Sequence, residues 1–208
     1  MALPVLVMGE KYKSSWSLRP WLALKHFDVA FDEVLLPLFT PQYHEQIGRW
    51  SPTGQVPVLH HDGVVVWDSL AILEYANETF FGQRGWPSHA AARAHARAIS
   101  AEMHSGFAAL RRELSFDLHR RGPALTPGED AARDIARVQR MWREARTRYG
   151  RGGEFLFGEF SIADAMYAPV ALRFLTYGIA LDPGCAAYVR TIDAMPAVRA
   201  WRAAAEAE

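Results

Sequence analysis

Strand-like patterns in this chain of 208 residues are confined to the part before Gly82, and only helical periodicity follows. Four short apolar runs predict strands, at 3–8, 31–36, 56–60 and 64–67. Helical spacing follows the first, second and fourth runs, and Asp62-Gly63 between the last two is typical of a β-hairpin. This order predicts a parallel strand pair joined to an antiparallel pair, and therefore a mixed four-stranded sheet with helices packed on it.

From residue 89 onward the sequence is rich in Ala and Arg, and its apolar residues recur at helical spacing. Predicted helices cover about 89–120, 129–149, 161–176, 185–193 and 196–206. We therefore predict an α+β chain of two domains, with a sheet domain at 1–82, a linker at 83–88 and an all-helical domain at 89–208.

Charge and cysteine content exclude several classes of protein. Basic and acidic residues number 23 each, which does not fit a nucleic-acid binder. The single cysteine, Cys185, excludes a disulfide within the chain and a Cys-rich zinc site, and we predict no metal. No apolar run approaches the ~20 residues of a membrane span, and the first residues do not resemble a signal peptide. We expect a cytoplasmic protein with no membrane partner.

A cluster of serines follows the first predicted strand. Pro20 is tolerated in a helix only within the first turn, so the helix should begin near Ser17, with Ser14 and Ser15 at its N-terminal end. Free N–H groups and the helix dipole stabilise negative charge there, so a thiol placed beside it loses its proton more easily. A serine hydroxyl could then donate a hydrogen bond to the thiolate. The alternative is ordinary helix capping, for which serine is also favoured.

A proline opens the third predicted strand. Pro57 follows Val56 in Gly54-Gln55-Val56-Pro57, and a proline inside a strand run favours an unusual backbone such as a cis peptide bond. A cis bond would turn the Val56 N–H and C=O outward, where an extended peptide-like ligand can pair with them. The alternative is a proline tolerated at the edge of the sheet.

Asp68-Ser69 stands between the fourth predicted strand and the next helix. Ser69 could cap that helix, whose free N–H groups could hold a carboxylate, and Asp68 could receive an ammonium group. An ordinary helix cap is again the alternative.

Together, these three motifs and their strand context resemble the N-terminal domain of glutathione transferases, and the organisation of the whole chain fits that family. Ser14 to Arg19 is most similar to the serine motif of the zeta class, the maleylacetoacetate isomerases, which reads Ser-Ser-Cys-Ser-Trp-Arg. Trp16 stands where that motif has its cysteine. The resemblance implies a thioredoxin-like N-terminal domain followed by an all-helical C-terminal domain.

The resemblance also implies residue roles and glutathione as the co-substrate. Ser14, with Ser15 as the fallback, stabilises the glutathione thiolate, and Val56 before cis-Pro57 pairs with the cysteinyl backbone. The other residues assigned to glutathione are Gln55 at the glycyl end, Asp68 and Ser69 at the γ-glutamyl end, and Trp16. In the helical domain, Ser161-Ile162-Ala163-Asp164 matches the capping box that opens the buried core helix of these proteins, and its role is structural.

The pocket for the second substrate should lie between Ser14 and the first helix of the C-terminal domain. Its candidate residues are Met103, His104, Phe107, Arg111 and Arg173. A stripe of Met and Phe is more often core than pocket, and His104 could be a satisfied buried histidine. An arginine beside an apolar pocket suits a carboxylate-bearing substrate, although both arginines could equally form interdomain salt bridges.

The predicted reaction is attack of a glutathione thiolate on an electrophilic carbon, giving conjugation or reversible addition that isomerises a double bond. The main alternative is a non-catalytic binding or regulatory module with the same fold. A thiol–disulfide redox role is weaker, because no cysteine lies near the serine cluster. The partners implied are glutathione, a small electrophile and a second copy of the chain in a homodimer.

Overall fold

The computed structural model describes residues 2–208, and it begins with a four-stranded sheet in the order β2-β1-β3-β4. The strands are β1 (Val5–Gly9), β2 (Asp32–Leu36), β3 (Val58–His61) and β4 (Val64–Trp67). β1 and β2 run parallel, whereas β3 is antiparallel to both β1 and β4. The predicted mixed sheet and its hairpin are confirmed.

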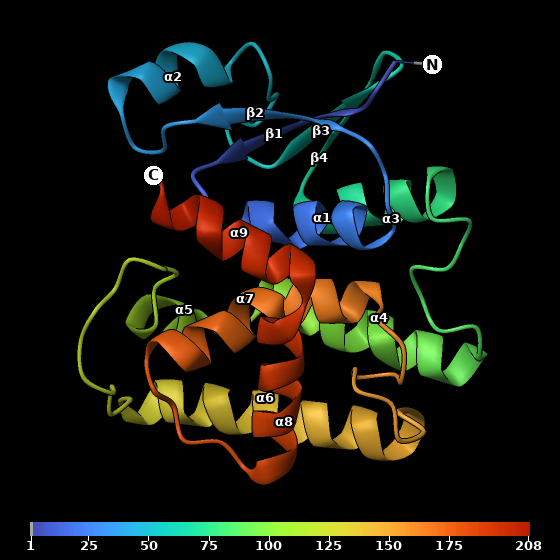
Figure 1. Ribbon diagram of the computed structural model, residues 1–208, viewed down its shortest axis with the longest axis vertical. Helices are drawn as coiled ribbons and strands as arrows, with labels where there is room; N and C mark the ends of the chain where they lie inside the picture. Colours follow the sequence, from blue (N-terminus) through green and yellow to red (C-terminus); the bar gives the residue numbers. More distant parts are fainter. Residues whose placement is uncertain (1) are drawn as a thin grey trace.

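Helices cover both faces of this sheet (Figure 1). α1 (Ser15–His26) and α3 (Ser69–Thr79) lie on one face, and α2 (Pro41–Ile47) lies on the other. On β1, Leu6 packs into the core under α1 and α3, and its neighbour Val7 packs under α2. Because successive side chains of a strand point to opposite faces, one apolar strand serves both layers.

The remainder of the described chain is helical. Its helices are α4 (Ala90–Ser105), α5 (Ala108–Glu113), α6 (Glu129–Tyr149), α7 (Ile162–Thr176), α8 (Pro183–Ala194) and α9 (Pro196–Glu206). α7 is buried along nearly its whole length and packs against α1, α4 and α8, as expected of a helix that is apolar on all sides. The predicted helical domain is confirmed, while the domain limits at residues 82 and 89 stay a prediction.

The single helix predicted at 89–120 is wrong. α4 ends at Ser105, because Gly106 is extended and Phe107 adopts a left-handed conformation with a φ of 62°. These two residues interrupt the helical hydrogen-bond ladder, and α5 is a separate short helix. Ala-rich and Arg-rich periodicity continues across the break, so the pattern alone did not reveal it.

The predicted start of α1 is also displaced. The helix begins at Ser15 rather than near Ser17, so Pro20 lies inside the helix instead of in its first turn. Pro20 has no N–H, and the carbonyl of Trp16 therefore lacks its usual main-chain donor. The packing of α1 against α3, α7 and α9 compensates for this loss.

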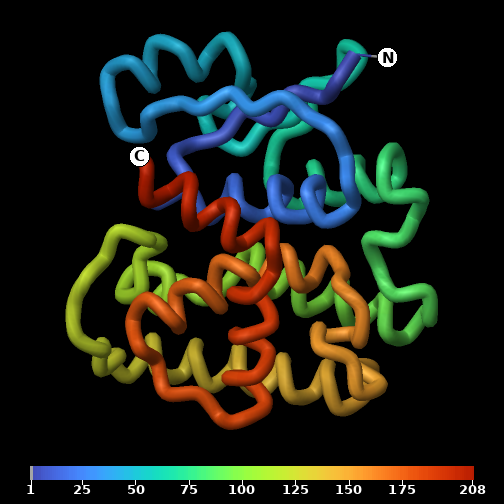
Figure 2. The backbone as a smooth tube through the Cα atoms, in the orientation of Figure 1, coloured from blue at the N-terminus to red at the C-terminus, as the bar shows by residue number. Residues whose placement is uncertain are grey.

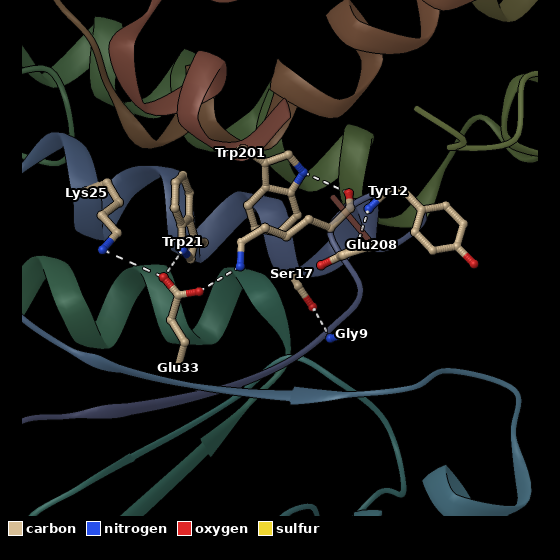
Figure 3. Close-up of polar contacts among 9 residues, drawn as sticks. Gly9, Tyr12, Ser17, Trp21, Lys25, Glu33, Trp201 and Glu208 are labelled. Atoms are coloured by element: carbon tan, nitrogen blue, oxygen red, sulfur yellow. Dashed lines mark hydrogen bonds and ion pairs between the residues drawn. The ribbon is translucent and has the colours of Figure 1, made fainter. Parts of the chain in front are cut away.

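The C-terminal helix, α9, contacts the loop that leads from β1 to α1, and Figure 2 shows the two segments side by side. Figure 3 shows the contacts: the Trp201 indole donates to the Lys11 carbonyl at 2.8 Å, and the Glu208 carboxylate accepts from the Tyr12 N–H at 3.2 Å. This end of the helical domain therefore fixes the residues just before Ser14. None of the helices in residues 2–208 has the length and apolar character needed to cross a membrane.

Candidate active site

A cavity of about 680 Å³ opens where the N-terminal ends of α1 and α3 meet the start of β3. Among the residues predicted for the site, it brings together Ser14, Trp16, Gln55, Val56, Pro57, Asp68, Ser69 and His104. Five other predicted residues are not in its lining: Ser15, Met103, Phe107, Arg111 and Arg173. The three sequence motifs thus converge on one cavity, whereas most of the proposed second-substrate residues are not part of its lining.

Ser14 occupies the N-cap position of α1, but its side chain makes no capping hydrogen bond. Its hydroxyl donates to Ser17 Oγ at 2.7 Å, and its N–H donates to the Glu10 carbonyl at 2.9 Å. The residue is 5% exposed and lies on the cavity wall. Ordinary helix capping therefore does not account for this hydroxyl.

Ser15 is occupied elsewhere, because its Oγ accepts a hydrogen bond from Arg173 Nη2 at 3.2 Å. Arg173 lies on α7 and also donates through Nε to the Leu114 carbonyl at 2.7 Å, while its Nη1 has no partner in the part of the chain that the structure describes. Burial, and then the charge of Arg111, lower the pKa of Arg173. Arg173 links the two domains, and of the two candidate serines only Ser14 lines the cavity.

The segment before β3 forms the side of the cavity. The Val56–Pro57 peptide bond is cis, as the resemblance to glutathione transferases implied. The Ser51 hydroxyl accepts the Gln55 N–H at 3.1 Å, and Tyr43 donates to the carbonyl of the neighbouring Gly54 at 3.0 Å. These bonds hold the turn against the rest of the domain.

Asp68, and not Ser69, caps α3. Asp68 Oδ1 accepts the Leu70 N–H at 2.9 Å, whereas Ser69 is already the first helical residue, so the prediction that Ser69 is the cap is wrong. Asp68 Oδ2 lies 3.1 Å from Nε2 of His104. Ser69 is fully buried, and its Oγ accepts from Arg19 Nη1 at 3.3 Å. Asp68 has a φ of 74°, and such backbone strain in residues other than glycine clusters at functional sites.

Trp16 lies close to two arginines. The guanidinium carbon of Arg19 lies 4.1 Å from the centre of the indole ring, and that of Arg111 lies 4.9 Å from it. Burial, followed by the charges of Arg111 and Arg173, lowers the pKa of Arg19 well below its usual value. Nε and Nη2 of Arg19 have no partner within residues 2–208. The wall behind Trp16 is therefore rich in buried positive charge and in unpaired donors.

The Met and Phe positions of α4 and α5 belong to the core. Met103 is fully buried and Phe107 is 8% exposed, and both pack in the main hydrophobic cluster. Arg111 donates to the carbonyls of Met103 and Gly106, which stabilises the break between α4 and α5. The core interpretation of this stripe is supported for these two residues.

Sequence reasoning missed six residues of the cavity wall: Lys13, Leu38, Phe39, Tyr43, Thr53 and Trp67. Lys13 is adjacent to Ser14 and pairs with Glu10 at 2.8 Å, so its position beside the serine cluster was a usable signal. No sequence pattern predicted that the loop containing Leu38 and Phe39 lines the cavity, because the loop reaches the site only through its path over the sheet. Within residues 2–208 no group of His, Cys, Asp and Glu is arranged to hold a metal ion.

Two family models match this chain in its two halves. Residues 13–79 match the N-terminal domain of glutathione S-transferase, and residues 129–204 match the C-terminal domain. The chain belongs to the glutathione S-transferase family, and it is an enzyme with glutathione as its co-substrate.

Two relatives by sequence and one solved structure show which members of the family this chain resembles. A probable maleylacetoacetate isomerase of Caenorhabditis elegans is 28% identical over 169 residues, which are 79% of this chain and 78% of the relative. The maleylacetoacetate isomerase of Rattus norvegicus is 38% identical over 104 residues, about half of each chain at 50% and 48%. A glutathione transferase homologue from Burkholderia, solved with bound glutathione, has a TM-score of 0.75, 24% identity and full coverage of both chains at 100%. This structural likeness confirms the fold.

Proposed function

We propose that this enzyme attacks small electrophiles with a glutathione thiolate that Ser14 stabilises. The observation that carries the proposal is the convergence, on one cavity, of the Ser14 hydroxyl, the cis-Pro57 turn and the start of α3 at Asp68 and Ser69. The cis-proline turn and the capped start of α3 each have an ordinary structural explanation, but their meeting with the Ser14 hydroxyl at one cavity supports a single ligand with a thiol, a peptide backbone and a charged amino-acid end.

In the proposed complex, the cysteinyl backbone of glutathione pairs with Val56. The ammonium group of the γ-glutamyl end lies at Asp68, and the carboxylate lies at Ser69, behind which Arg19 supplies positive charge. Gln55 faces the glycyl end, and Trp16 forms part of the wall. This orientation delivers the thiol to Ser14.

The chemical step that we propose needs no cofactor beyond glutathione. The Ser14 hydroxyl donates to the sulfur and lowers the thiol pKa, and the thiolate then forms a bond to the electrophilic carbon. In conjugation, the leaving group departs with its electron pair. In isomerisation, the thiolate adds to a conjugated double bond, the resulting single bond rotates, and expulsion of the thiolate restores the double bond. The isomerase names of the relatives favour testing the second outcome.

For the electrophile, we propose a carboxylate-bearing molecule beside Trp16. Arg111 and Arg173 contribute positive charge on this side, and Arg173 Nη1 and two Arg19 donors have no partner within the described chain. Because Arg111 and Arg173 lie outside the cavity lining, a substrate would have to displace their present partners or bind through the field they create.

The first experiment is calorimetry of reduced glutathione binding to the wild type and to Ser69→Ala. We expect micromolar to millimolar binding that weakens by about tenfold or more in the variant, because a charge-assisted hydrogen bond is lost. The pKa of the bound thiol is then compared in Ser14→Ala and Ser15→Ala, and only Ser14→Ala should raise it, by about 1–2 units.

Failure of the folded wild type to bind glutathione would overturn the proposed reaction and favour the non-catalytic binding module. If binding is intact, turnover is measured with a chloronitrobenzene and with a cis-unsaturated dicarboxylate, which separate conjugation from isomerisation.

We also propose that the protein is a cytoplasmic homodimer. β4 is an edge strand, and its side chains Val64, Val65 and Trp67 are 44%, 38% and 47% exposed. Exposed apolar edges favour association with another chain, which supports the expected dimer.

A further inference from the structure

The hydroxyl of Ser17 lies directly behind Ser14. Ser17 is fully buried in the first turn of α1, and its Oγ accepts two hydrogen bonds, one from the Ser14 hydroxyl at 2.7 Å and one from the Gly9 N–H at 3.2 Å. Figure 3 shows the Ser17 side chain reaching back to Gly9 at the end of β1. We propose that Ser17 is a positioning residue that orients the Ser14 hydroxyl and strengthens it as a donor.

The single proton of each serine hydroxyl determines how Ser14 and Ser17 would hydrogen-bond when a thiolate is bound. A hydroxyl has one proton and two lone pairs, so Ser14 cannot donate to Ser17 and to a thiolate at the same time. When a thiolate binds, the Ser14 proton turns toward the sulfur, and the Ser17 proton then turns toward Ser14 Oγ. The chain runs from the Gly9 N–H through Ser17 and Ser14 to the sulfur. Only hydroxyl rotation is needed, and no covalent bond to hydrogen breaks.

Each donor in such a chain is polarised by the one behind it, and this effect is larger in a buried environment. Ser17 is fully buried and Ser14 is nearly so. The first donor belongs to the main chain of the sheet, where Gly9 pairs with Leu36. A Cβ on Gly9 would lie 2.4 Å from Cδ1 of Leu38, so any larger residue at this position would force the Leu38 side chain to move.

A helix serine usually satisfies its hydroxyl by donating to the carbonyl one turn earlier. Ser17 instead connects the end of β1 to a cavity residue. A purely structural role would still satisfy the buried Gly9 N–H, so loss of stability on removing Ser17 does not distinguish the two explanations. The pKa of a bound thiol does, because it depends on how strongly Ser14 donates.

This inference rests on the proposed function, and its test uses the pKa of bound glutathione followed by thiolate absorbance during pH titration. The variants are Ser17→Ala, Ser14→Ala and the double variant. We expect Ser17→Ala to raise the thiol pKa by roughly 0.5 unit, with glutathione affinity changed by less than about threefold. In the Ser14→Ala background, removing Ser17 should cause no further shift, since Ser17 acts through Ser14.

Ser100→Ala is the matched control, because Ser100 is also a fully buried helical serine and its hydroxyl has no partner among the described residues. It should leave the thiol pKa unchanged. Ser17→Thr keeps the hydroxyl and should restore a pKa near that of the wild type.

Two results would overturn the role of Ser17 and leave the proposed function intact. The first is an unchanged thiol pKa in Ser17→Ala when Ser14→Ala raises it. The second is an equal shift of the thiol pKa when Ser17→Ala is made in the wild type and in Ser14→Ala. A wild type that binds glutathione without lowering its thiol pKa would overturn both this role and the proposed serine mechanism.

Discussion

At the scale of single residues, the arginines around Trp16 are the feature that most needs an explanation. Arg19 is fully buried, bonds only to Ser69 through Nη1, and leaves two donors unpaired in the described chain. Burying a charge without a paired carboxylate is unfavourable for folding, so a binding role gives the best reason for its presence. The carboxylate of the proposed γ-glutamyl end would compensate this charge.

Arg19→Met tests this explanation. We expect the affinity for glutathione to fall about tenfold, which is about 1.4 kcal/mol, because the charge behind Ser69 is lost. The free energy of unfolding should stay within about 1 kcal/mol of the wild type or rise, since a buried charge is replaced by an apolar chain of similar length. Calorimetry and urea denaturation measure the two quantities. A strongly destabilised variant with unchanged affinity would show that Arg19 is structural.

At the scale of elements, α9 acts on the active site through the loop before Ser14. Trp201→Phe keeps an aromatic ring but removes the donor to the Lys11 carbonyl. We expect a loss of about 1 kcal/mol in the free energy of unfolding, because a partly buried carbonyl loses its hydrogen-bond donor, together with a lower kcat/KM. Denaturation and steady-state kinetics provide the measurements.

Trp142→Phe is the control for this change. Trp142 is fully buried, and its indole N–H has no partner within residues 2–208. Removing that N–H sacrifices no hydrogen bond, so the variant should be more stable than Trp201→Phe and should retain its kcat/KM. Equal effects of the two substitutions on both quantities would argue against the α9 contact.

The start of α7 carries a pH-dependent contribution to stability. Burial raises the pKa of Asp164 from 3.8 to about 6, although hydrogen bonds from Leu156, Ser161 and Tyr188 favour its charged form. The folded state therefore binds this proton more tightly than the unfolded state between about pH 4 and 6. The contribution of Asp164 to stability is fully present below pH 4 and is lost as the pH rises through 6.

Asp164→Asn removes the titrating carboxyl group. The amide that replaces it brings a hydrogen-bond donor to a position where several hydrogen-bond donors already converge. We expect the variant to be less stable than the wild type at both pH 4.5 and pH 7. The difference should be larger at pH 4.5 by on the order of 2 kcal/mol, since protonated Asp164 benefits the wild type there. Urea denaturation at the two pH values measures this, and a difference independent of pH would contradict the raised pKa.

At the scale of the whole molecule, the apolar edge of β4 predicts assembly. Val65→Lys places a charge on this edge and should shift the particle mass in sedimentation from twice the chain mass toward that of one chain. Leu175→Lys is a control with similar exposure, because Leu175 is 41% exposed on α7, away from the sheet edge. A wild type that sediments as a monomer at high concentration would refute the dimer.

Much of the fold was predictable because its signals are local. Apolar runs, helical spacing and Asp62-Gly63 depend on neighbours in the sequence, and they predicted the succession of strands and helices along the chain, the hairpin and the helical second domain. The break at Gly106 and Phe107 was missed, because it depends on a left-handed residue held by the core and on Arg111 donating to nearby carbonyls.

The sequence by itself determined the family and the three motifs of the candidate site, since each motif is a short run of fixed residue types. Only the tertiary structure decided which serine lines the cavity, because Ser14 and Ser15 are neighbours that face different partners, Ser17 and Arg173. It also showed that Asp68 caps α3 and that the Gly9 N–H donates a hydrogen bond to Ser17. The physical reason is that hydrogen-bond direction and burial depend on distant segments brought together by folding, which no local pattern records.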